Sequence, residues 1–174
     1  MRKTIILICL GLCSLVFAQQ SKLVINNYTN YDYRGVIIAA GTNCSPSISN
    51  TYYPEPTYMP LIVAANTSAD VGLFSTGTVP FWDVHLSQTN PFVIRPFNHP
   101  SLSPGGVISQ NTDWYMSKFG MYYPGTTTSV PYMNTSVSSG VSACSTEPSY
   151  YISPYTSFEA EWFTIGTISY LEIY

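Results

Sequence analysis

The sequence predicts a single-domain antiparallel β-sandwich, an all-β fold, with a β-barrel as the alternative. Residues that suit a pleated, half-buried surface are abundant, among them 15 Tyr in 174 residues. The 13 Pro are spread along the chain, and each would cost roughly 3 kcal/mol inside a helix. Short apolar runs recur between Gly, Pro and Asn at spacings of about 8–12 residues, as they do in sandwiches and barrels.

The first half of the chain contains runs with the patterns of β-strands. Lys22–Tyr28 is a β-type run around Leu23, Val24 and Ile25, which Asn26 and Asn27 follow. Arg34–Ala40 has a continuous apolar centre, which is typical of a strand buried on both faces, and Leu61–Ala65 is similar. Val79–Leu86 alternates again, so its odd and even positions are expected on opposite faces.

The second half of the chain continues the same pattern. Phe92–Ile94 is a short run between prolines, and Trp114–Tyr123 is the longest mixed run. Thr126–Ser142 is rich in Ser and Thr and is interpreted as a loop plus an edge strand. Phe158–Ile165 alternates, and Thr167–Tyr174 closes the chain after a glycine. The first and last strands are expected to lie near each other.

The chain begins with the pattern of a secretory signal peptide, so residues 1–18 are assigned as signal and 19–174 as one β-sandwich domain. Two basic residues precede an apolar stretch from Thr4 to Phe17, and Ala18 offers a small residue for cleavage. This stretch is shorter than the ~20 residues that a membrane-spanning helix needs. The expected location is extracellular, with the periplasm as the alternative.

Cys44 and Cys144 are the cysteines that remain after such a signal is removed, and they are expected to form one disulfide. A bond that closes a loop of about 100 residues stabilises a fold by about 4.7 kcal/mol in the chain-entropy treatment. No Cys-x-x-Cys motif or closely spaced His pair accompanies them. The sequence therefore predicts no metal site and no cofactor.

The charge content excludes several classes of partner. Only 9% of the residues are charged, with 6 basic and 9 acidic side chains. Six basic residues cannot form the positive footprint of a nucleic-acid-binding surface. Low charge together with 15% aromatic residues is the reverse of a disordered composition. The expected partner is a glycan or another cell-surface ligand, without nucleic acid and without a membrane span, and the oligomeric state stays open.

Candidate ligand-binding residues come from an unusual loop and from the aromatic side chains. The loop Arg95–Gly106 combines a scarce basic residue and one of the 2 His with several prolines, and binding residues are often carried by loops on a rigid scaffold. The alternative is a purely structural connection. Adjacent Tyr residues on a strand point to opposite faces, so some rings should reach the surface and stack on ligands. The candidates are Arg95, Phe97, Asn98, His99, Trp114, Tyr122 and Tyr123.

Catalytic patterns are sparse. Asp83 and His85 share a strand face and could join His99 in an acid–base or metal site, but such spacing arises easily by chance. Glu159 and Glu161 form a carboxylate pair on one face, although alternation with aromatic residues also describes a solvated strand. The Gly-x-Ser-x-Gly and His-Glu-x-x-His motifs are absent. No catalytic residue is assigned.

The combined pattern favours a secreted, non-enzymatic β-sandwich that binds glycans or a cell surface through exposed aromatic and neutral polar residues. The first alternative is a structural or assembly subunit of an extracellular matrix or appendage, which pairs through Ser/Thr-rich edges such as Thr126–Ser136. A membrane-acting pore-forming protein and a hydrolase are further alternatives.

Overall fold

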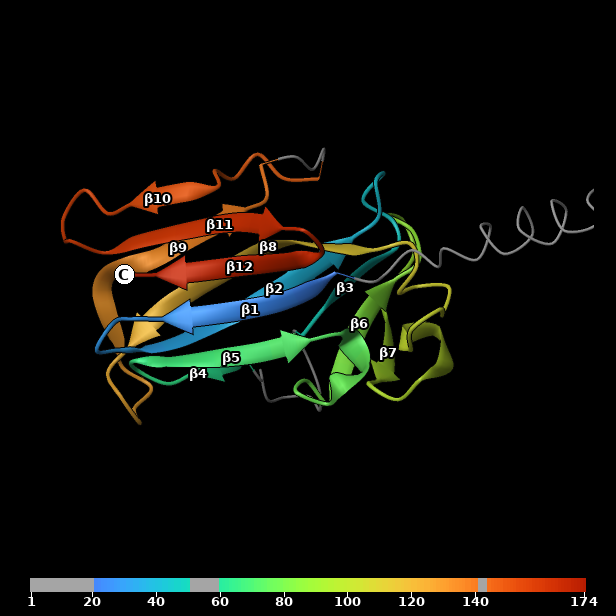
Figure 1. Ribbon diagram of the computed structural model, residues 1–174, viewed down its shortest axis with the longest axis horizontal. Coiled ribbons are helices and arrows are strands. Elements are labelled where there is room, and N and C mark those ends of the chain that lie inside the picture. The colour runs from blue at the N-terminus through green and yellow to red at the C-terminus, as the bar shows by residue number, and fades with distance from the viewer. Residues whose placement is uncertain (1–20, 51–59, 141–143) are drawn as a thin grey trace, which may run out of the picture.

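The computed structural model describes residues 21–50, 60–140 and 144–174 of the chain (Figure 1). The expected signal peptide at residues 1–18 lies outside these residues. The described part is built almost wholly of strands, with two short 3-10 helices, η1 (Phe74–Thr76) and η2 (Pro100–Leu102). It contains no helix with the length and hydrophobicity to cross a bilayer.

The first sheet, sheet A, has five strands in the order β10-β11-β12-β1-β5. The strand bounds are β1 Lys22–Asn27, β5 Thr67–Gly72, β10 Tyr150–Ile152, β11 Glu159–Ile165 and β12 Ile168–Ile173. β1 runs parallel to β12, with Lys22 beside Ile168 and Asn27 beside Ile173, while the other pairings are antiparallel. The first and last strands of the domain are therefore neighbours at the centre of this sheet, which confirms the expectation that they lie close together.

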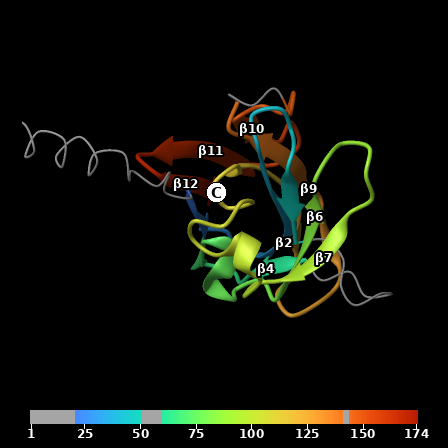
Figure 2. The same cartoon turned by 90° about the vertical axis from the view of Figure 1, so that its right-hand side faces the viewer.

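The second sheet, sheet B, is antiparallel throughout, in the order β7-β6-β3-β2-β8-β9, with β4 also paired to β2. Its strands are β2 Asp32–Ala40, β3 Ser47–Ser49, β4 Leu61–Val63, β6 Phe81–His85, β7 Val93–Pro96, β8 Asp113–Tyr122 and β9 Ser129–Ser138. The end view in Figure 2 shows the two sheets as separate layers. The predicted β-sandwich is confirmed.

The core fills the space between the layers. Alternation places Leu23 and Ile25 of β1 and Ala160 and Trp162 of β11 on the inner face of sheet A, where each is at most 2% exposed. Sheet B contributes large aromatic side chains, among them Trp82, which is 1% exposed. Burying aromatic side chains of this size is the main source of stability for a fold of short strands.

Strand β2 corrects one expectation from the sequence. Its inner side chains are fully buried, as at Ile37, but Val36 and Ile38 on the other face are only half-buried. The interpretation of a strand buried on both faces is therefore wrong for its outer face. A continuous apolar run does not by itself distinguish a central strand from one whose outer face is thinly covered.

A disulfide joins the predicted pair, Cys44 and Cys144, with their Cα atoms 5.2 Å apart. It links the loop after β2 to the segment that precedes β10. Two stretches that are 100 residues apart in sequence are thereby fixed to each other at one end of the sandwich. A structural disulfide is consistent with an oxidising, extracellular location.

Candidate functional site

Exposed tyrosines gather at one end of the sandwich, on the left in Figure 1, where β1 and β12 end and where the β8–β9 and β10–β11 connections turn. Their side chains are between 44% and 73% exposed, except for Tyr31, which is partly buried. We call this surface the tyrosine end. It consists of Tyr28, Tyr31, Tyr123, Tyr132, Tyr155 and Tyr174.

These six rings form three contacting pairs. Tyr28 and Tyr174 are stacked, with centroids 5.2 Å apart and an interplanar angle of 17°. Tyr31 and Tyr123 meet edge to face at 5.7 Å, and Tyr132 and Tyr155 pack at 4.8 Å. Each pair restricts the rotation of both rings. The rings are therefore held in place before any ligand arrives, which lowers the entropic cost of binding.

Tyr132 also carries backbone strain. Its φ is 63°, in the left-handed region that bulky side chains rarely occupy. The hydroxyl of Ser153 donates to its carbonyl oxygen at 3.1 Å, which ties β9 to the loop that holds Tyr155. Strained residues of this kind cluster at functional sites. The strain here orients an exposed ring at the boundary between the two sheets.

A buried asparagine organises the loop that carries Tyr28 and Tyr31. The Asn27 side chain is 1% exposed, and its amide nitrogen donates to the carbonyl oxygens of Tyr31, Val63 and Ala64 at 2.7–3.2 Å. Its oxygen accepts from the backbone N–H and the hydroxyl of Thr29. One side chain thus fixes the β1–β2 loop and joins it to the β4–β5 turn.

A buried carboxylate performs the same task for the next two loops. Asp32 is 7% exposed, and its two oxygens accept from the backbone N–H groups of Ala65 at 3.1 Å and Gly125 at 2.9 Å. Hydrogen bonds to an ionised acceptor are among the stronger ones in proteins. The β4–β5 turn and the β8–β9 hairpin are therefore anchored at a common point beneath the tyrosine end.

The loops at this end contain no charged side chain: residues 28–31, 64–66, 123–128 and 153–157 are Tyr, Thr, Asn, Ser, Ala, Pro and Gly. Antibody loops use the same mixture, in which Tyr supplies rigid contact area and small polar residues supply adaptable hydrogen bonds. The surface can therefore offer ring faces and neutral hydrogen-bonding groups, but it offers no charge to a ligand directly above the loops.

Glutamates lie on the outer face of sheet A beside this end. Glu172 accepts a hydrogen bond from the Asn26 amide at 2.7 Å, and its hydrogen bond with Tyr28 raises the pKa of that phenol above 10.0. Burial and then the nearby carboxylates, Glu172 foremost, raise the pKa of Tyr174 in the same direction. Both phenols therefore remain protonated, and able to donate, through the physiological pH range.

Of the predicted ligand-binding residues, only Tyr123 belongs to the tyrosine end. Tyr122 precedes it and lies half-buried on the outer face of sheet B, with the Arg34 guanidinium 5.1 Å from its ring centroid. Trp114 is at the other end of β8 and is 3% exposed, packed against Phe74 at 4.7 Å. Its indole N–H donates to the carbonyl of Gly72 at 3.3 Å.

The residues predicted on the proline-rich loop are not beside those tyrosines. β7 and η2 form the far edge of sheet B, at the opposite end of the molecule from the β8–β9 hairpin (Figure 1). His99 accepts from the backbone N–H of Ser101 at 3.2 Å and so caps η2, while Phe97 packs against the core. Arg95 is half-buried and Asn98 is exposed. The geometry fits the structural alternative for this loop.

The residues considered for catalysis are also separated. Asp83 and His85 lie on β6 in sheet B, where Asp83 is 4% exposed and His85 packs on Phe92 at 5.7 Å. Glu159 and Glu161 lie on the outer face of sheet A, on the other layer. Within the described residues, no group of three or more His, Cys, Asp or Glu side chains is arranged to hold a metal.

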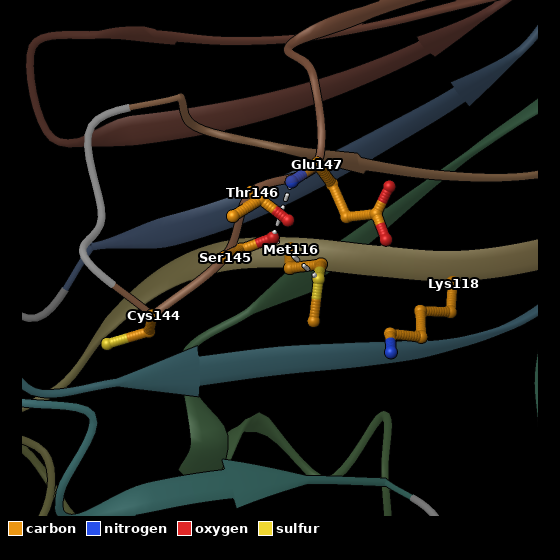
Figure 3. Close-up of a pocket in the computed structure, with 6 residues that line it drawn as sticks. All are labelled: Met116, Lys118, Cys144, Ser145, Thr146 and Glu147. Atoms are coloured by element: carbon orange, nitrogen blue, oxygen red, sulfur yellow. Dashed lines mark hydrogen bonds between the residues drawn. The ribbon is translucent and has the colours of Figure 1, made fainter.

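A pocket of about 300 Å³ lies beside the disulfide, between β8 and residues 144–147 (Figure 3). The Ser145 hydroxyl donates to the sulfur of Met116 at 3.4 Å and accepts from the backbone N–H of Glu147 at 3.0 Å. Lys118 supplies the basic side chain of the lining. Since the internal hydrogen bonds hold the covering segment on the strand, we interpret this pocket as part of the packing around the disulfide.

Comparison with protein-family models, curated proteins and solved structures finds no match to this chain. Its function therefore has to be argued from the geometry of the site alone. Sequence reasoning identified Tyr123 but not the other members of the tyrosine end, which are Tyr28, Tyr31, Tyr132, Tyr155 and Tyr174. The segment Asn27–Tyr31, in which two Tyr alternate with Asn and Thr in a turn, is the sequence signal that could have indicated it.

Proposed function

We propose that the protein binds neutral glycans through the tyrosine end and catalyses no reaction there. The observation that carries this proposal is the set of three tyrosine pairs on uncharged loops that buried Asn27 and Asp32 hold in place. Aromatic rings stack on the apolar C–H faces of sugars, and phenol, amide and hydroxyl groups pair with sugar hydroxyls.

The charges around the site indicate which glycans fit. The loops themselves carry no charge, and the nearest ionisable groups on the outer face of sheet A are carboxylates, Glu172 and Glu159 among them. Like charges repel, so these carboxylates disfavour sulfated or sialylated sugars. A neutral oligosaccharide meets no such penalty.

A glycan array probed with the folded chain, followed by calorimetric titration of the best neutral oligosaccharide, tests the proposal. Tyr155→Ala and Tyr28→Ala should each weaken binding about tenfold or more, as expected for central aromatic contacts. Tyr150→Ala is the matched control, because Tyr150 is 47% exposed but lies on β10, outside the tyrosine end. The absence of any neutral-glycan signal, or equal losses in the control, would refute it.

The alternative of an assembly subunit that pairs through the Thr126–Ser136 edge has less support. Within this edge the carbonyl of Tyr132 accepts from the Ser153 hydroxyl at 3.1 Å, and the positive φ of Tyr132 makes the strand irregular there. An irregular strand edge that is partly used within the chain is a poorer template for a second copy.

A further inference from the structure

The end of the sandwich opposite the tyrosine end has a cleft between the two sheets. The cleft has a volume of about 310 Å³ and is bounded by the start of β8, the end of β9 and the β11–β12 hairpin. This end faces the viewer in Figure 2. Its lining carries several hydroxyl groups and one carboxylate, although more of its accessible surface is apolar than polar: the main residues are Asp113, Trp114, Ser139, Thr164, Thr167 and Ser169.

Some of these groups are already used within the fold. The hydroxyls of Thr164 and Ser169 lie 3.3 Å apart and bond each other, and the backbone N–H of Trp114 donates to the hydroxyl of Ser21 at 3.2 Å. The indole N–H of Trp114 is directed to the carbonyl of Gly72, so its almost fully buried ring is fixed beneath the cleft. The cleft is therefore a preformed part of the fold.

Other polar groups of the lining are free to meet a ligand. The Asp113 carboxylate and the hydroxyls of Ser139 and Thr167 make no hydrogen bond to any other residue of the described ranges, and Asp113 and Thr167 are exposed. A carboxylate can accept from two neighbouring hydroxyls, and a serine or threonine hydroxyl can both donate and accept. This combination matches a compact ligand that carries several hydroxyls.

We propose that this cleft is a second binding site, which takes a single neutral sugar unit. Its volume is at the small end of the 300–1,000 Å³ that is usual for ligand pockets, so it suits one ring rather than an extended chain. Asp113, Ser139 and Thr167 supply the hydrogen bonds, and the carbon atoms of the lining side chains supply the apolar contact. The described residues of the lining include one carboxylate and no basic side chain, so they disfavour an anionic sugar.

The test uses two-dimensional amide NMR of the folded chain, titrated separately with the methyl glycosides of galactose, glucose, mannose and N-acetylglucosamine. At least one of them should shift the amides of Ser139 and of residues 164–169 saturably. Asp113→Ala should weaken that sugar at least tenfold, and Thr167→Val should weaken it severalfold. Asp70→Ala is the matched control, because Asp70 is an exposed Asp on β5 outside the cleft, and it should change affinity less than twofold.

Each outcome separates the two sites, because their amides are at opposite ends of the molecule. If none of the four sugars shifts the cleft amides, or if Asp113→Ala binds as tightly as the wild type with a native spectrum, the cleft proposal is overturned. Cleft binding that persists in Tyr155→Ala while glycan binding at the tyrosine end is lost supports two independent sites. If glycans fail to bind the tyrosine end but a sugar still shifts the cleft amides, the proposed function is refuted and the cleft proposal is supported.

Discussion

Replacement of Asn27 by alanine is the sharpest perturbation of the loops that carry the tyrosines. The side chain is 1% exposed and joins three segments: the β1–β2 loop, the end of β4 and the β4–β5 turn. Alanine fits the strand position but removes every one of these bonds. The backbone N–H of Thr29 then loses its side-chain acceptor, and the carbonyl oxygens of Tyr31, Val63 and Ala64 lose the Asn27 amide. The carbonyls of Tyr31 and Ala64 keep one donor each, the hydroxyls of Thr29 and Thr67.

The magnitude follows from the number of bonds that one amide can make. An Asn side chain has two N–H groups and an oxygen with two lone pairs, so the contacts amount to about four effective hydrogen bonds. Each contributes about 1 kcal/mol net, and part of the loss is recovered because the loops can reach water. We expect Asn27→Ala to lower the free energy of unfolding by about 3 kcal/mol, or the melting temperature by roughly 6–12 °C.

Urea and thermal unfolding followed by circular dichroism measure this loss. Asn26→Ala is the matched control, because the neighbouring Asn26 is half-buried and bonds one carboxylate, that of Glu172. Its unfolding free energy should stay within about 1 kcal/mol of the wild type. If Asn27→Ala is as stable as Asn26→Ala, Asn27 is not the organising residue, and the argument for prearranged tyrosines fails.

Two further predictions concern the disulfide and the tyrosine hydroxyls. Replacing Cys44 and Cys144 together by serine should lower the unfolding free energy by about 3–5 kcal/mol, which urea unfolding would show as a lower midpoint. An unchanged midpoint would contradict a stabilising role of the disulfide. Tyr28 and Tyr150 each make a hydrogen bond with a glutamate, and these bonds raise the pKa of both phenols above 10.0. The stability that the two hydrogen bonds contribute is therefore complete below pH 10. It is lost as the pH rises through the folded-state pKa of each phenol. Absorbance titration at the phenolate band should show a late-ionising fraction that becomes smaller in Tyr28→Phe and in Tyr150→Phe. Tyr115 and Tyr174, whose pKa values burial raises, should supply the late fraction that remains. A late fraction that is unchanged in both variants would count against these bonds.

Much of the fold follows from local patterns in the sequence. The alternation of Phe158–Ile165 correctly assigns Trp162 to the core and Glu161 to the surface, because the two-residue period of a strand leaves no other arrangement. The short strands β3 and β10, of three residues each, and the six-residue strand β5 were not predicted. The sequence of β5, Thr67–Gly72, lacks the apolar pattern of a strand because small and polar residues surround one Val. Such strands depend on the neighbour they pair with, and a single sequence does not show which segment that is.

The candidate site was harder to predict for the same reason. Tyr28 and Tyr174 are at opposite ends of the described domain in sequence, yet they stack because β1 and β12 are adjacent in sheet A. Trp114 and Tyr123 bound the same predicted strand, but the length of β8 separates them. Local reasoning identified the exposed residue types, whereas long-range strand pairing determines which of them form one surface.

The parallel pairing of β1 with β12 also has a consequence for the order in which the fold forms. These are the first and last strands of the described domain, so their pairing joins segments that nearly the whole domain separates in sequence. Contacts between such distant segments form slowly, because the entropy of closing a long loop is lost before the contacts stabilise it. The middle of sheet A is therefore expected to be among the last parts of the sandwich to assemble.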